Sequence, residues 1–392
     1  MKRFILIAGW FVLLLPLQLH ADTYNERTLV RIALATATDR EFIQSSSIDV
    51  VDAGPDWVKA LLRPSEFLLL ADRGLKVEIL WDEMERDRAL WRAADEAAKA
   101  HVPNASYYTP SHFDTVNPPP GSLMEHLLAL HNANPNITRL YDIGDVVSGN
   151  YDIIAIEVSK NPDVDENEPK IRIYGNIHGD EKSALMVPCD VLDWILNNYP
   201  SDPAAAMLVD HAELWFIPMG NPDGNAANSR YNGHGIDLNR NFWGPNGNED
   251  PPGDPFSEPE TQAIRDLTEV MGKRFTASIS FHAGAIVFNS VYNYTSTATT
   301  DEPIFFSSRT GGPNGGAMPS PFGLAQAYEN GCTTQGFWYT NGADWYITRG
   351  DTNDWSYAKW SDLDTTLEVT LDKTPPVSQI PIFCAEHRQA VI

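Results

Sequence analysis

Apolar residues recur with two different periods along this chain, and each period predicts a different kind of element. Alternation at every second residue, or a short apolar run bounded by turn residues, predicts a strand. The expected strands are TLVRIALAT (28–36), VKALLR (58–63), KVEILW (76–81), DIIAIEVSK (152–160), KIRIYGNI (170–177), AELWFIPM (212–219), FTASISFHAGAIVFN (275–289) and TTLEVTL (365–371).

Apolar spacing of three and four residues predicts helices between these strands. The expected helices are PSEFLLLADRG (64–74), SLMEHLLALHNANP (122–135), EKSALMVPCDVLDWILNNYP (181–200) and SEPETQAIRDLTEVMGK (257–273). Pro188 predicts a bend in the third of them. Ser257 and Glu260 have the spacing of a capping box at the start of the fourth.

The order of these elements predicts an α/β fold. We expect a mixed, mostly parallel twisted sheet with helices on both faces, preceded by a small α/β N-terminal segment. Ligands of such sheets collect at the carboxyl ends of the strands. His178 follows directly after the expected strand 170–177 and therefore stands where this rule places a ligand.

The chain divides into three parts. Residues 1–21 are typical of a signal peptide, because Lys2 and Arg3 precede a short apolar stretch that ends near Ala21. Residues 22–105 form the small N-terminal segment and a linker, and residues 106–392 form the larger domain. We expect no membrane span in the mature chain, and we expect export to the periplasm or the exterior.

Composition narrows the classes of partner. The formal net charge of −25 argues against binding of nucleic acid or of an anionic membrane. Cys189, Cys332 and Cys384 permit one disulfide and leave one free thiol, and the pairing stays open. No pair of cysteines has the Cys-x-x-Cys spacing, so a cysteine-based zinc site is not expected.

His178 and Glu181 are three residues apart at a strand end, so both side chains can converge on one metal ion. The motif is short, and an ordinary strand-to-helix turn explains it equally well. His282 ends the apolar run SISF beside small residues. It fits a third ligand or a packed core histidine.

Three further segments carry residues suited to chemistry. Arg230 and Arg240 lie on a glycine- and asparagine-rich loop, where guanidinium groups can bind a carboxylate or an oxyanion, although a solvated turn is the simpler reading. Tyr346 stands at the entry to a loop. Glu368 lies in an alternating strand and either faces solvent or acts as a general base.

Taken together, these segments resemble the zinc metallocarboxypeptidase family of carboxypeptidase A, and most closely its carboxypeptidase N and E branch. The segments that carry the resemblance are GNIHGDE (175–181), NPDG (221–224), SRYNGHGIDLNRNF (229–242), SFHAGAIVFN (280–289), WYITRGDTNDWSY (345–357) and TLEVTLDKTPP (366–376). The resemblance covers roughly residues 107–391. Their shared order makes the resemblance far more specific than any one segment would be.

The resemblance implies a role for each residue. His178, Glu181 and His282 would bind one zinc ion, for which carboxypeptidase A is a standard example of a His₂Glu site. The remaining roles are oxyanion stabilisation by Arg230, binding of the substrate's terminal carboxylate by Asn239 and Arg240, closure by Tyr346, and general base catalysis by Glu368 on a zinc-activated water. The substrate would be a peptide or protein with a free C-terminus.

The chain departs from the family's pattern at the positions that select the terminal side chain. Asn293 and Asn353 stand where members that cleave after lysine or arginine carry acidic residues, although Asp344 and Asp351 are near in sequence. Asp180 takes the place of a substrate-binding arginine of the pancreatic members. The branch also carries a transthyretin-like β-domain after the peptidase, which the resemblance would place beyond Ile392.

Two other functions compete with a carboxypeptidase. One is a zinc amidase of the same fold that trims cell-wall peptides. The other is an inactive module that grips carboxylate termini, against which the presence of Glu368 and a full ligand set argues. Residues 22–105 resemble the N-terminal segments of bacterial secreted members, which act as pro-segments or as packing domains. The oligomeric state does not follow from the sequence.

Overall fold

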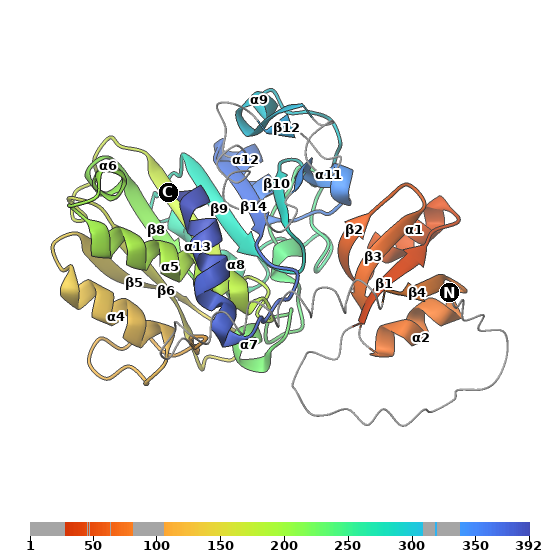
Figure 1. Ribbon diagram of the computed structural model, residues 1–392, viewed down its shortest axis with the longest axis horizontal. Coiled ribbons are helices and arrows are strands. Elements are labelled where there is room, and N and C mark those ends of the chain that lie inside the picture. Colours follow the sequence, from red (N-terminus) through yellow and green to blue (C-terminus); the bar gives the residue numbers. More distant parts are fainter. Residues whose placement is uncertain are drawn as a thin grey trace. The chain divides into compact units, whose positions relative to one another are not determined.

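The computed structural model describes residues 28–80, apart from 45, 47 and 63, and residues 106–308, 318–319 and 338–392. The predicted signal peptide and most of the predicted linker lie outside the described residues. The chain forms two compact units, residues 1–93 and residues 94–392. Figure 1 draws the first unit in red and orange and the second in yellow to blue.

The first unit is an antiparallel sheet of four strands in the order β2-β3-β1-β4, with two helices. Its elements are β1 (Thr28–Ala33), α1 (Ala37–Gln44), β2 (Asp49–Ala53), β3 (Trp57–Leu62), α2 (Pro64–Asp72) and β4 (Lys76–Ile79). Gly74 has a φ of 70° and ends α2, as predicted. The sequence did not reveal α1 and β2, which are short and carry charged residues within them.

The second unit is built around an eight-stranded sheet. Its elements are α4 (Leu123–Ala133), β5 (Thr138–Asp145), β6 (Asp152–Val158), β7 (Lys170–Gly175), α5 (Lys182–Asn198), α6 (Pro203–His211), β8 (Glu213–Ile217), α7 (Pro222–Ala227), η1 (Leu238–Arg240), α8 (Pro259–Glu269), β9 (Ala277–His282), β10 (Val287–Ser290), α9 (Glu302–Phe305), β11 (Phe306–Ser308), β12 (Met318–Pro319), β13 (Trp338–Asn341), α11 (Gly342–Trp345), α12 (Thr352–Trp360), β14 (Leu363–Glu368), η3 (Val377–Gln379) and α13 (Ile380–Val391).

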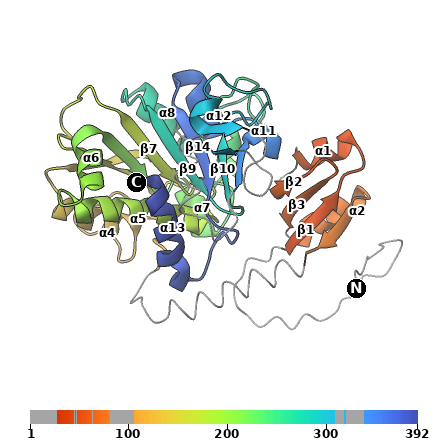
Figure 2. The same ribbon diagram turned by 45° about the horizontal axis from the view of Figure 1, so that its top comes forward.

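The strand order of the large sheet is β13-β10-β14-β9-β7-β8-β6-β5. The neighbours from β14 to β8 are parallel, whereas β10 is antiparallel to β14 and β6 is antiparallel to β8. Helices cover both faces, with α4, α5, α6 and α13 on one and α8 and α12 on the other (Figures 1 and 2). The predicted mixed, mostly parallel α/β sheet is confirmed.

Alternation along the central strands explains the two layers of core. Ile154 and Ile156 of β6 pack with α5 and α13, whereas Ile153 and Ala155 face the cluster around α8. Because successive side chains of a strand leave opposite faces, one buried strand supplies both layers. Gly175 ends β7 without a side chain, since a Cβ there would lie 2.3 Å from the carbonyl oxygen of Ala184.

Two local expectations were wrong. The apolar stretch 275–289 forms two strands, β9 and β10, because Gly284 adopts a φ of 128° between them and its N–H donates to Thr370 O at 2.7 Å. The predicted capping box is not formed. Glu258 is the N-cap of α8 without a side-chain cap, and the Ser257 hydroxyl donates to the Glu258 carboxylate at 2.9 Å.

A buried ionic cluster lies in the middle of the large sheet and consists of Arg172, Asp362 and Asp364. The Arg172 guanidinium donates to Asp364 Oδ2 at 2.8 Å and lies 3.7 Å from Asp362 Oδ2. Burial raises the pKa of both carboxyl groups, and that of Asp362 reaches about 7. Arg172 also lies over the rings of Phe275 and Trp355 at 5.4 and 5.9 Å.

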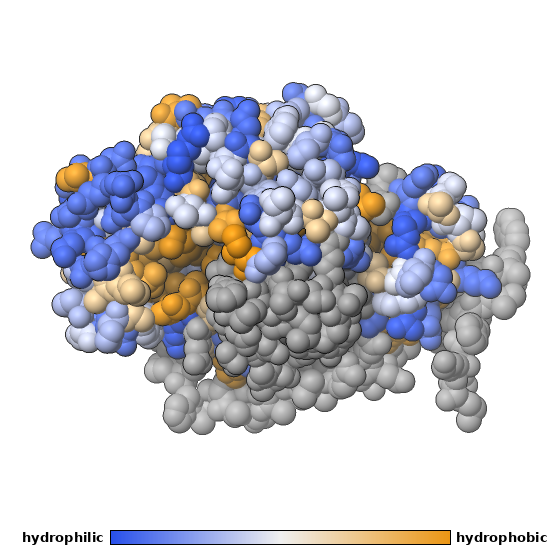
Figure 3. Space-filling model, turned by 90° about the horizontal axis from the view of Figure 1, so that it is seen from above, coloured by the Kyte–Doolittle hydropathy of each residue, from blue (hydrophilic) through white to orange (hydrophobic). Residues whose placement is uncertain are grey.

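Two of the three cysteines lie among the described residues. Cys189 and Cys384 are buried and free, and Cys332 lies outside the described residues. None of the helices in the described ranges is long and apolar enough to cross a membrane. On the face drawn in Figure 3, hydrophilic residues cover most of the described part of the larger unit, in keeping with the acidic composition.

Candidate metal and substrate site

The turn after β7 holds His178 and Glu181 in place through its backbone. Asn176 adopts a φ of 55°, and its side-chain amide donates to the carbonyl oxygens of His178 and Glu181 at 2.9 and 3.0 Å. Gly179 packs against the backbone of residues 224–225, where a Cβ would lie 2.0 Å from the Gly224 carbonyl carbon. The glycine is therefore required by close packing, and the turn is a rigid support rather than a loose loop.

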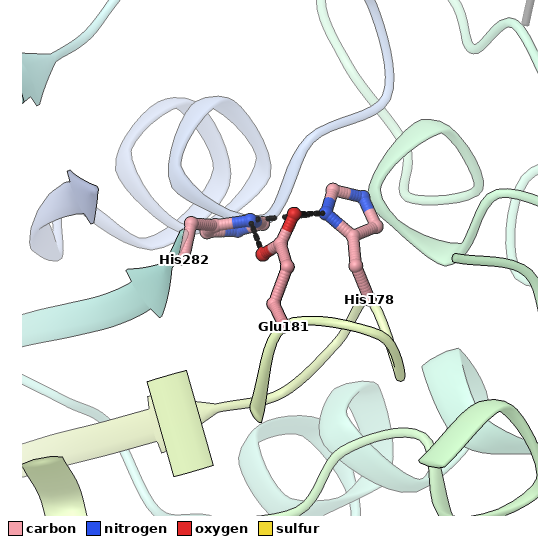
Figure 4. Close-up of side chains that lie close together, drawn as sticks. All are labelled: His178, Glu181 and His282. Carbon is pink, nitrogen blue, oxygen red and sulfur yellow. Dashed lines mark hydrogen bonds and ion pairs between the residues drawn. The ribbon is translucent and has the colours of Figure 1, made fainter. Parts of the chain in front are cut away.

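His178, Glu181 and His282 converge at the carboxyl ends of β7 and β9. The two imidazole rings approach the Glu181 carboxylate from opposite sides (Figure 4). Nδ1 of His178 lies 2.8 Å from Oε1 of Glu181, Nδ1 of His282 lies 3.0 Å from Oε2, and the two Nδ1 atoms are 3.2 Å apart. All three side chains are buried. The structure thus brings His282, the predicted third ligand, within hydrogen-bond distance of the other two.

These three residues fit a zinc ion. Ligand atoms at about 2.0–2.2 Å from a tetrahedral ion are about 3.3–3.5 Å apart, which is close to the separations found here. Two imidazoles and one carboxylate are ligands that zinc takes in catalytic sites. Among the residues that the structure describes, this trio is the only group of three or more metal-binding side chains whose ligand atoms all lie within 4.8 Å of one another.

Asp237 supports the trio from behind. Its Oδ1 lies 3.1 Å from Nε2 of His178, and its Oδ2 accepts a hydrogen bond from Nε of Arg230 at 2.9 Å. A carboxylate on the far nitrogen of a ligand histidine fixes the ring and leaves Nδ1 for the metal. Asp237 was not singled out from the sequence, although it lies in the same segment as Arg230 and Arg240.

Electrostatics favour an ionised ligand carboxylate. Burial alone would raise the pKa of Glu181, but His178, Lys373 and His282 hold it well below its usual range. Lys373 Nζ lies 3.2 Å from Oε1 of Glu181, and the backbone N–H of Ala283 donates to Oε2 at 3.1 Å. Lys373 lies in the segment 366–376 that carries the family resemblance, but no role was assigned to it from the sequence.

The pKa values of His178 and His282 are shifted in opposite directions. Burial lowers the pKa of His282, which therefore favours the neutral form that binds a metal. Burial and Arg230 lower the pKa of His178, but Glu181 and Asp237 outweigh them and raise it overall. The pKa of Asp237 is held well below its usual range because Arg230 and His178 outweigh the effect of burial.

Glu368 ends β14 beside the trio. It is paired with His282 in the parallel register of β14 and β9 and with Val287 in the antiparallel register of β14 and β10. Paired residues of neighbouring strands direct their side chains to the same face. Glu368 is half-buried. The structure thus brings it to the strand end that carries His282.

Arg230 and the proposed carboxylate clamp lie on the loop that follows α7. Nη1 of Arg230 is 3.3 Å from Nδ1 of His178, and Nδ2 of Asn239 is 3.4 Å from Nε2 of His282. Arg240 donates to the Asn239 carbonyl at 2.8 Å, and its Nε lies 3.3 Å from Glu249. Arg230 and Asn239 therefore lie beside the trio, and Arg240 lies beside Asn239.

The surroundings of Arg240 favour its charged form. Burial alone would lower its pKa, but Asp237 and Tyr346 raise it overall. Tyr346 follows α11 and packs on Trp345, with the ring centroids 4.8 Å apart. Gly350 has a φ of 88°, and a Cβ there would lie 2.4 Å from the Arg240 carbonyl oxygen.

Asn293 and Asn353 are in direct contact. The side-chain amide of Asn293 donates to Oδ1 of Asn353 at 2.6 Å, and both residues are buried. Two positions that the sequence offered as separate specificity residues therefore form one patch. Asp351 is buried beside them and accepts from the Thr348 hydroxyl, whereas Asp344 is exposed.

Comparison with known proteins agrees with this geometry. A family model described as zinc carboxypeptidase matches residues 123–390. Carboxypeptidase SOL1 of Arabidopsis thaliana is 33% identical over 271 residues, which is 65% of this chain and 50% of that protein. The carboxypeptidase N catalytic chain of Homo sapiens is 26% identical over 319 residues, 69% of this chain and 66% of that protein.

The fold has counterparts among solved structures. The crystal structure of carboxypeptidase A from Helicoverpa armigera superposes with a TM-score of 0.67 at 16% identity and covers 94% of this chain and 98% of its own. The chain belongs to the zinc carboxypeptidase family, and the resemblance drawn from its motifs is confirmed. The matched part of this chain spans half the length of carboxypeptidase SOL1.

Proposed function

We propose that the larger unit is an exported zinc carboxypeptidase that removes the C-terminal residue of peptides or proteins. The observation that carries the proposal is the convergence at one sheet edge of His178, Glu181 and His282 with Glu368 paired beside His282. A metal trio alone would also suit a structural ion. A half-buried carboxylate on the next strand end supplies the base that hydrolysis requires.

His178, Glu181 and His282 would hold the zinc ion. When bound, zinc supplies Lewis acidity that polarises a carbonyl group and lowers the pKa of water toward ~7. Glu368 accepts the proton of the attacking water and later gives it to the departing amine. Proton transfer by a placed side chain contributes on the order of 10²–10⁴ in rate.

Arg230 is placed to stabilise the oxyanion. Its Nη1 lies near the ligand nitrogen of His178, and Asp237 holds its Nε at 2.9 Å, so the guanidinium is oriented before substrate arrives. Losing such a donor costs on the order of 10²–10³ in rate. Asn239 and Arg240 bind the terminal carboxylate, and Tyr346 closes over it, which restricts cleavage to the last residue. Asn293 and Asn353 contact the terminal side chain.

The test is mass spectrometry of a mixed peptide library incubated with the purified exported protein, with and without a zinc chelator. We expect stepwise loss of single C-terminal residues that the chelator abolishes. Cleavage of amide bonds in cell-wall peptides, without removal of C-terminal residues from ordinary peptides, would favour the zinc amidase. Cleavage only after limited proteolysis would indicate that residues 22–105 act as an inhibitory pro-segment.

Glu368→Gln separates the enzyme from a binding module. The substitution keeps the size of the side chain and removes the base. We expect turnover to fall by at least ~10²-fold while zinc content is retained. Cleavage at the wild-type rate would show that Glu368 is not the base.

A further inference from the structure

Three buried asparagines form a cluster beside the proposed carboxylate clamp, which we call the amide cluster: Asn289, Asn293 and Asn353. Asn289 donates to Oδ1 of Asn293 at 2.9 Å, and Asn293 donates to Oδ1 of Asn353 at 2.6 Å. Gly342 closes one side, because a Cβ there would lie 1.5 Å from Oδ1 of Asn293 and 2.9 Å from Oδ1 of Asn289.

Two amide atoms of this cluster are buried without a hydrogen-bond partner in the structure: Oδ1 of Asn289 and Nδ2 of Asn353. Their residues are 5% and 0% exposed. Native proteins leave few buried polar atoms unsatisfied, because each one loses its hydrogen bonds to water without compensation. Two such atoms in one small cluster therefore indicate a missing polar partner.

The cluster lies next to the groups that would hold the substrate. Oδ1 of Asn239 accepts from the backbone N–H of Thr352 at 3.2 Å, and Asn353 is the next residue. Asn289 lies on β10 two residues beyond Val287, which is paired with Glu368. A substrate whose terminal carboxylate meets Asn239 and Arg240 would thus place its last side chain near this cluster.

The carboxylates beside the cluster are already engaged. Both oxygens of Asp354 accept from the backbone N–H of Asn293 at 3.0 Å. Both oxygens of Asp351 lie within hydrogen-bond distance of the Thr348 hydroxyl, at 2.8 and 3.1 Å. Burial raises the pKa of each, which disfavours the charged form. The open groups are therefore neutral, one amide NH₂ donor and one amide oxygen acceptor.

This set matches a carboxamide, whose oxygen accepts two hydrogen bonds and whose NH₂ donates. Rotating any one amide exchanges a donor for an acceptor but leaves the set neutral. We propose that the amide cluster selects a C-terminal residue with a neutral carboxamide side chain, glutamine or asparagine, rather than lysine or arginine. The proposal rests on the proposed carboxypeptidase function, of which it names the substrate class.

The test compares peptides of one sequence that differ only in the last residue, which is Gln, Asn, Lys, Leu or Glu. We expect kcat/KM for the better of Gln and Asn to exceed that for Leu by about tenfold, roughly the effect of one net hydrogen bond, and to exceed that for Lys by more. Faster cleavage of the Lys peptide, or equal rates for all five, would overturn the proposal.

Failure of the proposed function gives a different result. If none of the peptides is cleaved, calorimetric titration of the same peptides into the zinc-loaded protein still tests the cluster. Tighter binding of the Gln or Asn peptide than of the Lys peptide would support the recognition while the peptidase assignment fails. Equal or reversed binding would refute both.

Variants of the cluster locate the determinant. Asn353→Asp replaces an open donor with an acceptor and adds a charge, so the Gln-to-Lys ratio of kcat/KM should fall by about a hundredfold, tenfold for each substrate. Asn161→Asp, on an exposed loop before β7, is the matched control and should leave the ratio unchanged. An unchanged ratio in a zinc-loaded Asn353→Asp protein would contradict the proposal.

A second variant guards against misfolding of the first. Oδ1 of Asn289 is the open acceptor of the cluster. Asn289→Ser shortens the side chain and takes this acceptor away while keeping a small polar group. We expect the preference for Gln or Asn over Leu to fall by about tenfold in protein that retains its zinc. A preference that survives this change would contradict the proposal.

Discussion

The strands β7, β9 and β14 carry two buried charged clusters that behave differently. Near the start of β14, Arg172 donates to Asp364, lies 3.7 Å from Asp362 and packs over the rings of Phe275 and Trp355. At the carboxyl ends of β7 and β9, His178, Glu181 and His282 turn their possible ligand atoms toward one point. Buried charge alone therefore does not mark function. Convergence of possible ligand atoms on one point indicates a metal site.

The first prediction breaks the carboxyl-end cluster. Glu181→Gln removes the carboxylate that both histidines contact, so zinc should be lost. Turnover should fall by more than the ~10²–10³-fold that one oxyanion donor costs. Atomic emission and peptide assays measure the two effects. Asp364→Asn, in the buried ionic cluster, is the control and should keep its zinc. Full zinc occupancy in the Glu181 variant would refute the ligand assignment.

The second prediction breaks the central cluster instead. Arg172→Met leaves two buried carboxyl groups without their cation, which should lower the free energy of unfolding by about 3–5 kcal/mol. The zinc content of the folded protein should not change. Denaturant unfolding of the zinc-free protein measures the loss. Adding Asp362→Asn and Asp364→Asn to this variant should restore much of the lost free energy of unfolding. If it does not, the loss is caused by packing rather than by charge.

The third prediction concerns the support of the trio. Asp237→Asn should weaken the orientation of His178 and lower zinc affinity by about 10–100-fold, since partners behind ligand histidines have effects of that size. Competition with a fluorescent chelator measures the affinity. Asp254→Asn, on an exposed part of the same segment, is the matched control. Equal zinc affinities for Asp237→Asn and Asp254→Asn would show that Asp237 orients Arg230 but not His178.

The fourth prediction uses pH. The pKa of Asp362 is about 7 in the fold against an ordinary value of 3.8, so its contribution to stability is full below about pH 4 and is lost as the pH rises through about 7. Wild-type, zinc-free protein should lose ~2 kcal/mol more between pH 5 and pH 8 than Asp362→Asn does. Denaturant titrations at both pH values measure this, and parallel losses would exclude Asp362 as the cause.

Periodicity predicted the central sheet well because its strands are buried on both faces. β6 and β8 are nearly continuous apolar runs, and β7 alternates apolar residues with Lys170 and Arg172, so the pattern predicts a strand in each case. The stretch 275–289 was mistaken for one strand because its two halves are equally apolar. The break depends on the backbone of Gly284, whose positive φ no hydrophobic pattern reports.

The metal trio could be named from motifs, but its supports could not. His178 and Glu181 are close in sequence, so their spacing carries information. Asp237 meets His178 across 59 residues, and Lys373 meets Glu181 across a still longer stretch. Both residues lie in segments that carry the family resemblance, but their partners could not be read from the sequence, because these contacts depend on the way that the sheet and its loops come together.

The sequence by itself determined the class of fold and the family, and it predicted the residues that would bind the metal and the end of the substrate. These depend on local spacing and on the order of motifs, which the chain carries before it folds. Only the tertiary structure decided that Asn293 touches Asn353, that Asn289 joins them, and which of their amide atoms stay open. Contacts between distant segments depend on register and packing, and the unsatisfied atoms appear only when every other hydrogen bond has been assigned.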